Sequence, residues 1–208
     1  LALDFDAGSY TMTDNLGAAE SGTFAEDFTE PGTYVFASSR VTTAANTARF
    51  RVAADVVVGA FPFQAAYSSP AAYAAQPFVA AREFVSTAAL LDGTYNRFSV
   101  TRSPGGAQDS TLLAMRLSGS GTVLEICNDA IIYKIDLCPA ASKRTYAVAA
   151  GADDTWVGTN VANSSDVANF RMARIGGQNV YLAGGVNLAP AVQFMRIGLP
   201  DSSSWPTT

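Results

Sequence analysis

Residues 112–127, which read LLAMRLSGSGTVLEIC, are the stretch on which the fold prediction rests. Two apolar runs, 112–118 and 122–127, flank the glycine-rich turn at 118–121. In each run large apolar side chains alternate with small or polar ones, as in strands with one buried face. A tight turn between two such runs predicts an antiparallel hairpin.

Similar short runs, separated by turn residues, recur along most of the chain. We expect further strands at 9–13, 32–37, 48–53, 55–61, 94–102, 130–137, 145–150, 155–159, 169–175, 180–183 and 192–197. Such spacing predicts an all-β, antiparallel sandwich or barrel with at most one or two short helices. The candidate helix runs from Phe78 to about Thr87, and Pro77 would open it, because proline suits the first position of a helix.

The order of elements suggests two related β units. Thr-Tyr pairs at Thr33, Thr94 and Thr145 each open a strand that is followed by a polar loop and a hairpin. This similarity suggests a duplicated unit, with chance as the alternative. The Gly-Thr-Tyr opening is also similar to that of lipocalin-like barrels, and no residue role is carried over from it.

The predicted organisation has four parts. They are an N-terminal β unit with an acidic leading segment at 1–61, an alanine-, proline- and aromatic-rich connector at 62–90, a larger C-terminal β unit at 91–200 and a Ser/Pro tail at 201–208. A chain of 208 residues can bury a substantial core in either one large or two small β domains.

Composition excludes several kinds of chemistry. Histidine is absent, and 18 acidic residues against 13 basic ones give a net charge of −5. Without histidine there is no Ser-His-Asp or Cys-His nucleophile pair and no imidazole metal site. The acidic balance argues against a nucleic-acid partner. We therefore expect a non-catalytic protein with no cofactor, no metal and no nucleic-acid partner.

The two cysteines, Cys127 and Cys138, are expected to form a disulfide, which indicates an oxidising compartment. Two buried free thiols are the alternative. A clean hairpin with a strand at 130–137 would separate the cysteines by about 26 Å. A disulfide needs Cα atoms about 5.5 Å apart. The bond therefore requires a loop that doubles back, and it excludes that strand.

Charge is unevenly distributed. Residues 1–39 hold seven acids and no base, and the remaining residues hold 11 acids and 13 bases. A solvated acidic face explains this pattern. The alternative is an electrostatic contact with arginines of a sheet, since Arg49 and Arg51 share one face of a strand while Phe50 takes the other.

The 26 residues between Asp55 and Arg82 carry no charge. Their aromatic side chains are predicted to form a protein–protein interface, because interface centres are poor in charge and rich in aromatics. The predicted interface residues are Phe61, Phe63, Tyr67, Tyr73 and Phe78. The alternative is that the segment packs inside its own protein. Prolines at 62, 70 and 77 argue against a membrane-spanning helix.

These observations predict an extracellular structural or assembly protein, at a cell surface or in a particle such as a fibre or virion. Its expected partner is a second copy of itself or another protein subunit. The alternative function is a secreted β module that binds a sugar or a small apolar molecule. A large internal cavity or a tryptophan-lined groove would favour that alternative.

Overall fold

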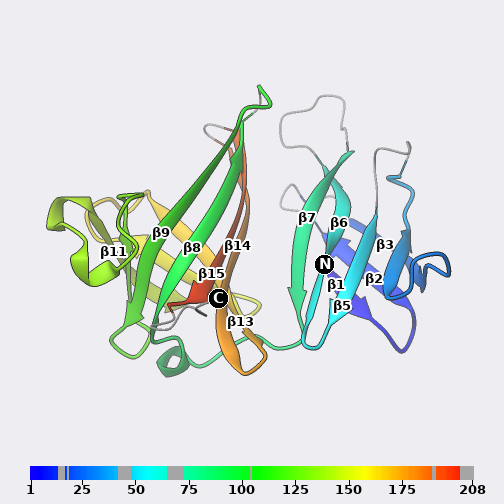
Figure 1. Cartoon of the computed structure of the whole chain (residues 1–208), viewed down its shortest axis with the longest axis horizontal. Coiled ribbons are helices and arrows are strands. Elements are labelled where there is room, and N and C mark those ends of the chain that lie inside the picture. The colour runs from blue at the N-terminus through cyan, green and yellow to red at the C-terminus, as the bar shows by residue number, and fades with distance from the viewer. Residues whose placement is uncertain are drawn as a thin grey trace, which may run out of the picture. The chain divides into compact units, whose positions relative to one another are not determined.

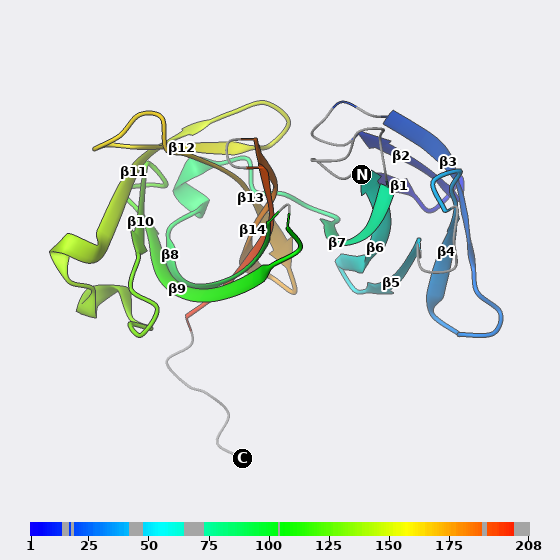
Figure 2. The same ribbon diagram turned by 90° about the horizontal axis from the view of Figure 1, so that it is seen from above.

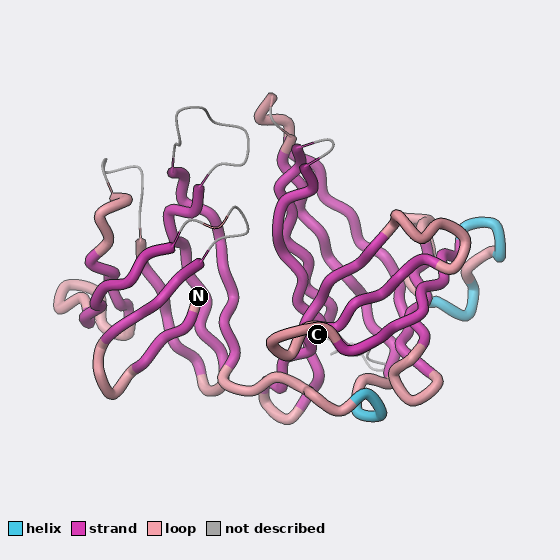
Figure 3. Tube along the Cα trace, turned by 180° about the vertical axis from the view of Figure 1, so that it is seen from behind, coloured by secondary structure: helices cyan, strands magenta, loops and turns pink. Residues whose placement is uncertain are grey.

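The structure is a computed structural model that describes residues 1–13, 17, 19–41, 48–64, 73–103, 105–188 and 191–201. The chain divides into two compact units, Leu1–Arg82 with Gly185–Gln193 and Glu83–Gly184 with Phe194–Thr208. All described strand pairs are antiparallel, so the all-β prediction is confirmed. The helical segments of the described residues are three short 3-10 turns, η1 (Ala88–Leu90), η2 (Ile135–Leu137) and η3 (Ala140–Ser142) (Figure 3).

A seven-stranded sheet forms the N-terminal unit, and each strand pairs with the next one along the chain (Figure 1). Its strands are β1 (Ala2–Asp4), β2 (Ser9–Thr13), β3 (Ala19–Glu26), β4 (Thr33–Ala37), β5 (Arg49–Ala53), β6 (Val56–Gln64) and β7 (Tyr73–Ala81). Within the range 62–90, β6 and β7 form a long hairpin, and the first segment of this unit ends at Arg82.

The helix expected at 78–87 does not form. Pro77 pairs with Ala60 inside β7, and Phe78 pairs with Gly59. A proline is tolerated here because β7 is the last strand of the sheet, so one of its backbone edges has no ladder partner within that sheet. The helix prediction was wrong because the hairpin with β6 outweighs the local preference of an alanine-rich segment.

Aromatic side chains fill the core of the N-terminal unit. Phe50 is buried while Arg49 and Arg51 on either side of it are exposed, as the alternation of a strand predicts. The ring of Phe36 lies 4.7 Å from that of Phe50 and 5.1 Å from that of Phe61. The buried core consists of Tyr10, Met12, Phe24, Phe36, Ala48, Phe50, Val57, Phe61 and Phe78.

Eight strands close into a barrel in the C-terminal part of the chain, which Figure 2 shows as a ring. They are β8 (Gly93–Arg102), β9 (Gln108–Ser118), β10 (Val123–Cys127), β11 (Lys143–Ala150), β12 (Trp156–Asn160), β13 (Val167–Ile175), β14 (Gln178–Leu188) and β15 (Ala191–Pro200). The hairpin predicted from residues 112–127 is β9–β10, with Val123 opposite Ser118. The ring closes because the last strand, β15, lies beside the first, β8.

The segment at 83–92 leads into the barrel and covers one of its ends. Val85 and Leu91 are buried in the barrel core. The hydroxyl of Tyr95 donates a hydrogen bond to the carbonyl oxygen of Leu91 at 3.0 Å. The backbone N–H of Gly121, in the β9–β10 turn, donates to the carboxylate of Asp92 at 2.7 Å. The chain therefore seals this end with its own apolar side chains.

Candidate ligand site inside the barrel

β8 directs an arginine into the barrel. Tyr95, Arg97 and Ser99 are buried on this strand, while Phe98 and Val100 between and beyond them are exposed. Alternate residues of a strand share a face, and Tyr95 belongs to the barrel core. Arg97, which is 7% exposed, therefore projects inward.

β15 contributes a second arginine to the same interior. A methyl group placed on Gly198 would lie 2.9 Å from the Cβ of Tyr181, so Gly198 faces the barrel core. Arg196 and Phe194 lie two and four residues earlier and share that face. The guanidinium of Arg196 stacks over the ring of Phe194, 4.2 Å from its centroid, and Phe194 packs against the core.

Tyr181 on β14 interacts electrostatically with both arginines. It is fully buried, and its ring stacks on that of Phe170 with centroids 4.9 Å apart. Burial raises the pKa of Tyr181, while the positive charges of Arg97 and Arg196 oppose the rise. Burial and then the charge of Arg97 lower the pKa of Arg196. Tyr181 and Arg196 therefore respond to each other and to the charge of Arg97.

We call Arg97, Tyr181 and Arg196 the arginine site. The Nε atoms of both arginines and the Tyr181 hydroxyl are buried, and none has a hydrogen-bond partner among the described residues. Among the described residues, neither arginine forms an ion pair with a carboxylate. Buried charge is normally paired or hydrogen-bonded because its desolvation is costly. The arginine site departs from that rule at three atoms, one on each of its residues.

Asp166, the carboxylate that acts on Arg196 from a distance, has partners of its own. It accepts a hydrogen bond from the hydroxyl of Tyr146 at 2.9 Å and one from the amide of Asn160 at 2.8 Å. It also forms an ion pair with Arg144 at 3.9 Å. Burial first, and then the hydrogen bond to Asp166, raise the pKa of Tyr146. Asp166 therefore organises the adjoining wall of the barrel and leaves the arginine site positively charged.

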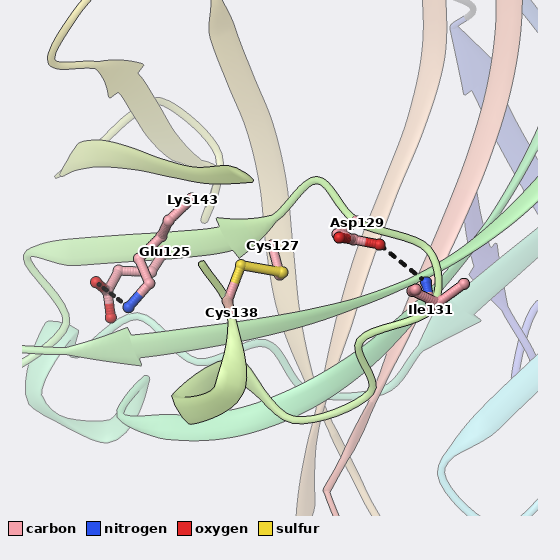
Figure 4. The surroundings of a disulfide bond; sticks show 6 residues. All are labelled: Glu125, Cys127, Asp129, Ile131, Cys138 and Lys143. Atoms are coloured by element: carbon pink, nitrogen blue, oxygen red, sulfur yellow. Dashed lines mark hydrogen bonds and ion pairs between the residues drawn. A yellow bond between two sulfur atoms is a disulfide. The ribbon is translucent and has the colours of Figure 1, made fainter. Parts of the chain in front are cut away.

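The predicted disulfide is confirmed and lies on the outside of the barrel wall (Figure 4). The Cα atoms of Cys127 and Cys138 are 5.7 Å apart. The disulfide packs with Ala114 and Ile135 in a small cluster separate from the barrel core. Ala114 lies between two inward-facing residues of β9, which places the cluster on the outer face.

The strand expected at 130–137 was wrong, as the disulfide requires. Residues 128–142 double back through the turns η2 and η3 and carry Cys138 to Cys127. The backbone N–H of Ile131 donates to the carboxylate of Asp129 at 3.3 Å, which tightens the start of the loop (Figure 4). Ile131, Tyr133 and Leu137 are exposed, so this apolar run does not bury a strand face.

The aromatic residues predicted to form an interface lie mainly inside the N-terminal unit. Phe61 is 0% and Phe78 8% exposed, and both belong to its core. Phe63 and Tyr73 are partly buried, and Tyr67 lies outside the described residues. This placement fits the alternative in which the segment packs inside its own unit. The interface stays a prediction for the accessible parts of these side chains.

The acidic leading segment does meet arginines of its own sheet. The Nη1 atom of Arg49 lies 3.3 Å from Oδ2 of Asp27 and 3.5 Å from Oε2 of Glu30. Arg40 and Glu20 form a largely buried ion pair at 2.9 Å. The electrostatic contact proposed from the charge distribution is therefore present within the N-terminal unit.

Reasoning from the sequence missed the arginine site. In the predicted strand at 94–102, both alternate faces contain aromatic or apolar residues, so the inward face could not be chosen. Arg196 ends an uncharged stretch of 21 residues that begins after Arg174. The sequence does place Arg196 on the same strand face as Phe194, but whether that face lies inside depends on closure of the barrel.

The described residues contain no group of three or more cysteine, aspartate or glutamate side chains positioned to hold a metal ion. Within the same ranges, no helix has both the length and the apolar character needed to cross a membrane. No protein-family model matches the chain, and no curated protein matches it in sequence.

Proposed function

We propose that this protein is a non-catalytic extracellular binding protein whose C-terminal barrel holds a small molecule. The observation that carries the proposal is the arginine site, where three buried polar atoms on inward faces of a closed barrel have no hydrogen-bond partner among the described residues. Leaving a buried donor or acceptor unsatisfied costs about 1–3 kcal/mol, and more for a charged group. A bound ligand that supplies the partners would remove that cost.

The barrel has a size suited to this role. Eight-stranded antiparallel barrels have an interior that is either filled by side chains or holds one small ligand. Here one end is filled by apolar residues such as Leu91, Met115 and Leu124. The polar groups of Arg97 and Arg196 lie on the same interior surface. A site with apolar walls and a few converging polar groups is the usual form of a small-molecule site.

The disulfide supports the extracellular part of the proposal. Disulfides persist in secreted and surface proteins and are rare in reducing compartments. Cys127 and Cys138 are buried in their own small cluster on the barrel wall, which fits a structural bond.

Assembly with a protein partner is the second candidate function. One observation favours it: Ile131, Tyr133 and Leu137 are 77%, 55% and 70% exposed on the loop that the disulfide closes. Large apolar side chains gathered on one surface often mark a contact with another protein. Sedimentation of the wild type beside a variant with all three changed to serine would test this function.

Native mass spectrometry tests the binding function directly. The oxidised protein is incubated with a small-molecule extract of its source, desalted and sprayed under native conditions. We expect an adduct that denaturation releases and that Arg97→Gln loses. Arg102→Gln is the matched control because Arg102 lies on the same strand and is exposed. Spectra of wild-type protein without any adduct would contradict the proposed function.

A further inference from the structure

We propose that the barrel ligand is an organic oxyanion, a carboxylate or phosphate with an apolar body, held by Arg97 and Arg196. This inference rests on the proposed binding function and names its ligand class. It also replaces the neutral sugar or apolar molecule expected from the sequence.

Charge gives the first argument. The two guanidinium groups face the same interior, and no described carboxylate is paired with either of them. Two like charges in a poorly solvated interior repel each other more strongly than they would in water. A neutral ligand would leave that repulsion in place. An oxyanion would offset this repulsion, because its negative charge would lie beside both guanidinium groups.

Hydrogen-bond geometry gives the second argument. An arginine presents a planar fork of donors that matches the paired oxygens of a carboxylate or phosphate. The unpartnered Nε atoms belong to those forks. The hydroxyl of Tyr181 makes no hydrogen bond of good geometry with the described residues, although Arg97 lies near enough to oppose the rise of its pKa. The raised pKa keeps this hydroxyl protonated and able to donate at neutral pH. The guanidinium groups of Arg97 and Arg196 and the hydroxyl of Tyr181 could therefore donate hydrogen bonds to one acceptor group.

Neighbouring aromatic rings provide the apolar part of the site. Phe194 supports the guanidinium of Arg196 from one side, which holds its plane in a defined orientation. Phe170 stacks on Tyr181 and continues the same interior surface. A ligand with its charged end at the arginines would place an apolar body against these rings.

Three probes separate the outcomes: decanoate, which is anionic; decanol, which has the same chain length without the charge; and inorganic phosphate. Isothermal titration measures each probe against the wild type, Arg97→Gln, Arg196→Gln and the control Arg102→Gln. We expect decanoate to bind the wild type, and each interior variant to bind it about 10- to 100-fold more weakly. Arg102→Gln should bind it as the wild type does.

The outcomes divide cleanly. Equal binding of decanoate and decanol would overturn the oxyanion class and leave the binding function standing. Binding of phosphate alone would support an oxyanion site and would assign it to free phosphate, which overturns the apolar body. Absence of binding by all three probes would overturn both proposals.

Thermal melting without ligand keeps the test valid if a variant binds nothing. Because an unpaired buried charge is removed, Arg97→Gln should melt at the wild-type temperature or above it. Decanoate should raise the melting temperatures of the wild type and of Arg102→Gln more than that of Arg97→Gln. A variant that loses binding and melts well below the wild type would show that Arg97 has a structural role, and this would overturn its assignment to the ligand.

Discussion

The indole Nε1 of Trp156 donates a hydrogen bond to the carbonyl oxygen of Val85 at 3.0 Å, and both residues are buried. This bond joins β12 to the segment that seals one end of the barrel. It explains why a tryptophan, rather than a smaller aromatic residue, occupies this position of the core.

We expect Trp156→Phe to lower the free energy of unfolding by about 1–3 kcal/mol, because the Val85 carbonyl loses its donor. Urea denaturation followed by circular dichroism measures the change. Tyr133→Phe removes the hydroxyl of an exposed residue and should stay within about 0.5 kcal/mol of the wild type. Equal stability of the two variants would contradict the role given to the bond.

Reduction of the Cys127–Cys138 disulfide should lower the free energy of unfolding by about 2–3 kcal/mol, as expected for a short closed loop. Urea denaturation with and without reductant measures this loss. Thiol titration of the denatured protein should find no reactive thiol before reduction and two afterwards. Two thiols in the unreduced protein would contradict the disulfide.

Gly121→Ala should destabilise the protein more than Gly106→Ala does. Both glycines have positive φ angles, +78° and +82°, so both substitutions strain the backbone. A methyl group on Gly121 would also overlap the carbonyl oxygen of Ala88, whereas nothing among the described residues lies within 4 Å of one on Gly106. We expect a difference of about 1–3 kcal/mol in urea denaturation, and equal effects would count against this packing.

The pKa of Asp27 lies below its usual value of 3.8, chiefly because the Thr29 side chain and backbone donate hydrogen bonds to its carboxylate. A carboxyl whose folded-state pKa is lowered stabilises the fold above its unfolded pKa. That contribution is lost as the pH falls through the folded value. Asp27→Asn should therefore flatten the pH dependence of unfolding below pH 3.8, and an unchanged profile would contradict the shift.

Phe61→Ala should lower the free energy of unfolding by about 3–5 kcal/mol, because Phe61 is fully buried among aromatic rings. Phe28→Ala is the control, since Phe28 is 96% exposed and should change stability by less than about 0.5 kcal/mol. Sedimentation of the same variants tests the predicted interface. A stable Phe61→Ala variant that loses self-association would favour the interface over the core.

Strands with clear alternation could be located from the sequence, and strands whose few large apolar residues stand among small ones could not. The strand at 9–13 was predicted with the bounds it has, and Phe50 was given the correct face. β3 and β7 were missed because small residues, and Pro77 in β7, hide their alternation. The run at 130–137 is apolar without being a strand, because the disulfide fixes its path.

The arginine site illustrates a different obstacle. Arg97 and Arg196 are 99 positions apart, and each is unremarkable within its own strand. Their relation exists only once β15 lies beside β8, and local patterns do not encode that pairing. The cysteines, 11 positions apart, were within reach of a distance argument, whereas the arginines were not.

The closing of the barrel by its first and last strands also sets an order for biosynthesis. The seven strands of the N-terminal sheet are complete when Ala81 has been made, and each can pair with the strand just before it. The barrel must wait for β15, which ends at Pro200, before β8 gains its second neighbour. Until β15 has been made, the β8 edge is an open template for pairing with another nascent chain. Synthesis of β15 therefore decides whether the barrel closes or β8 pairs with a strand of a different chain.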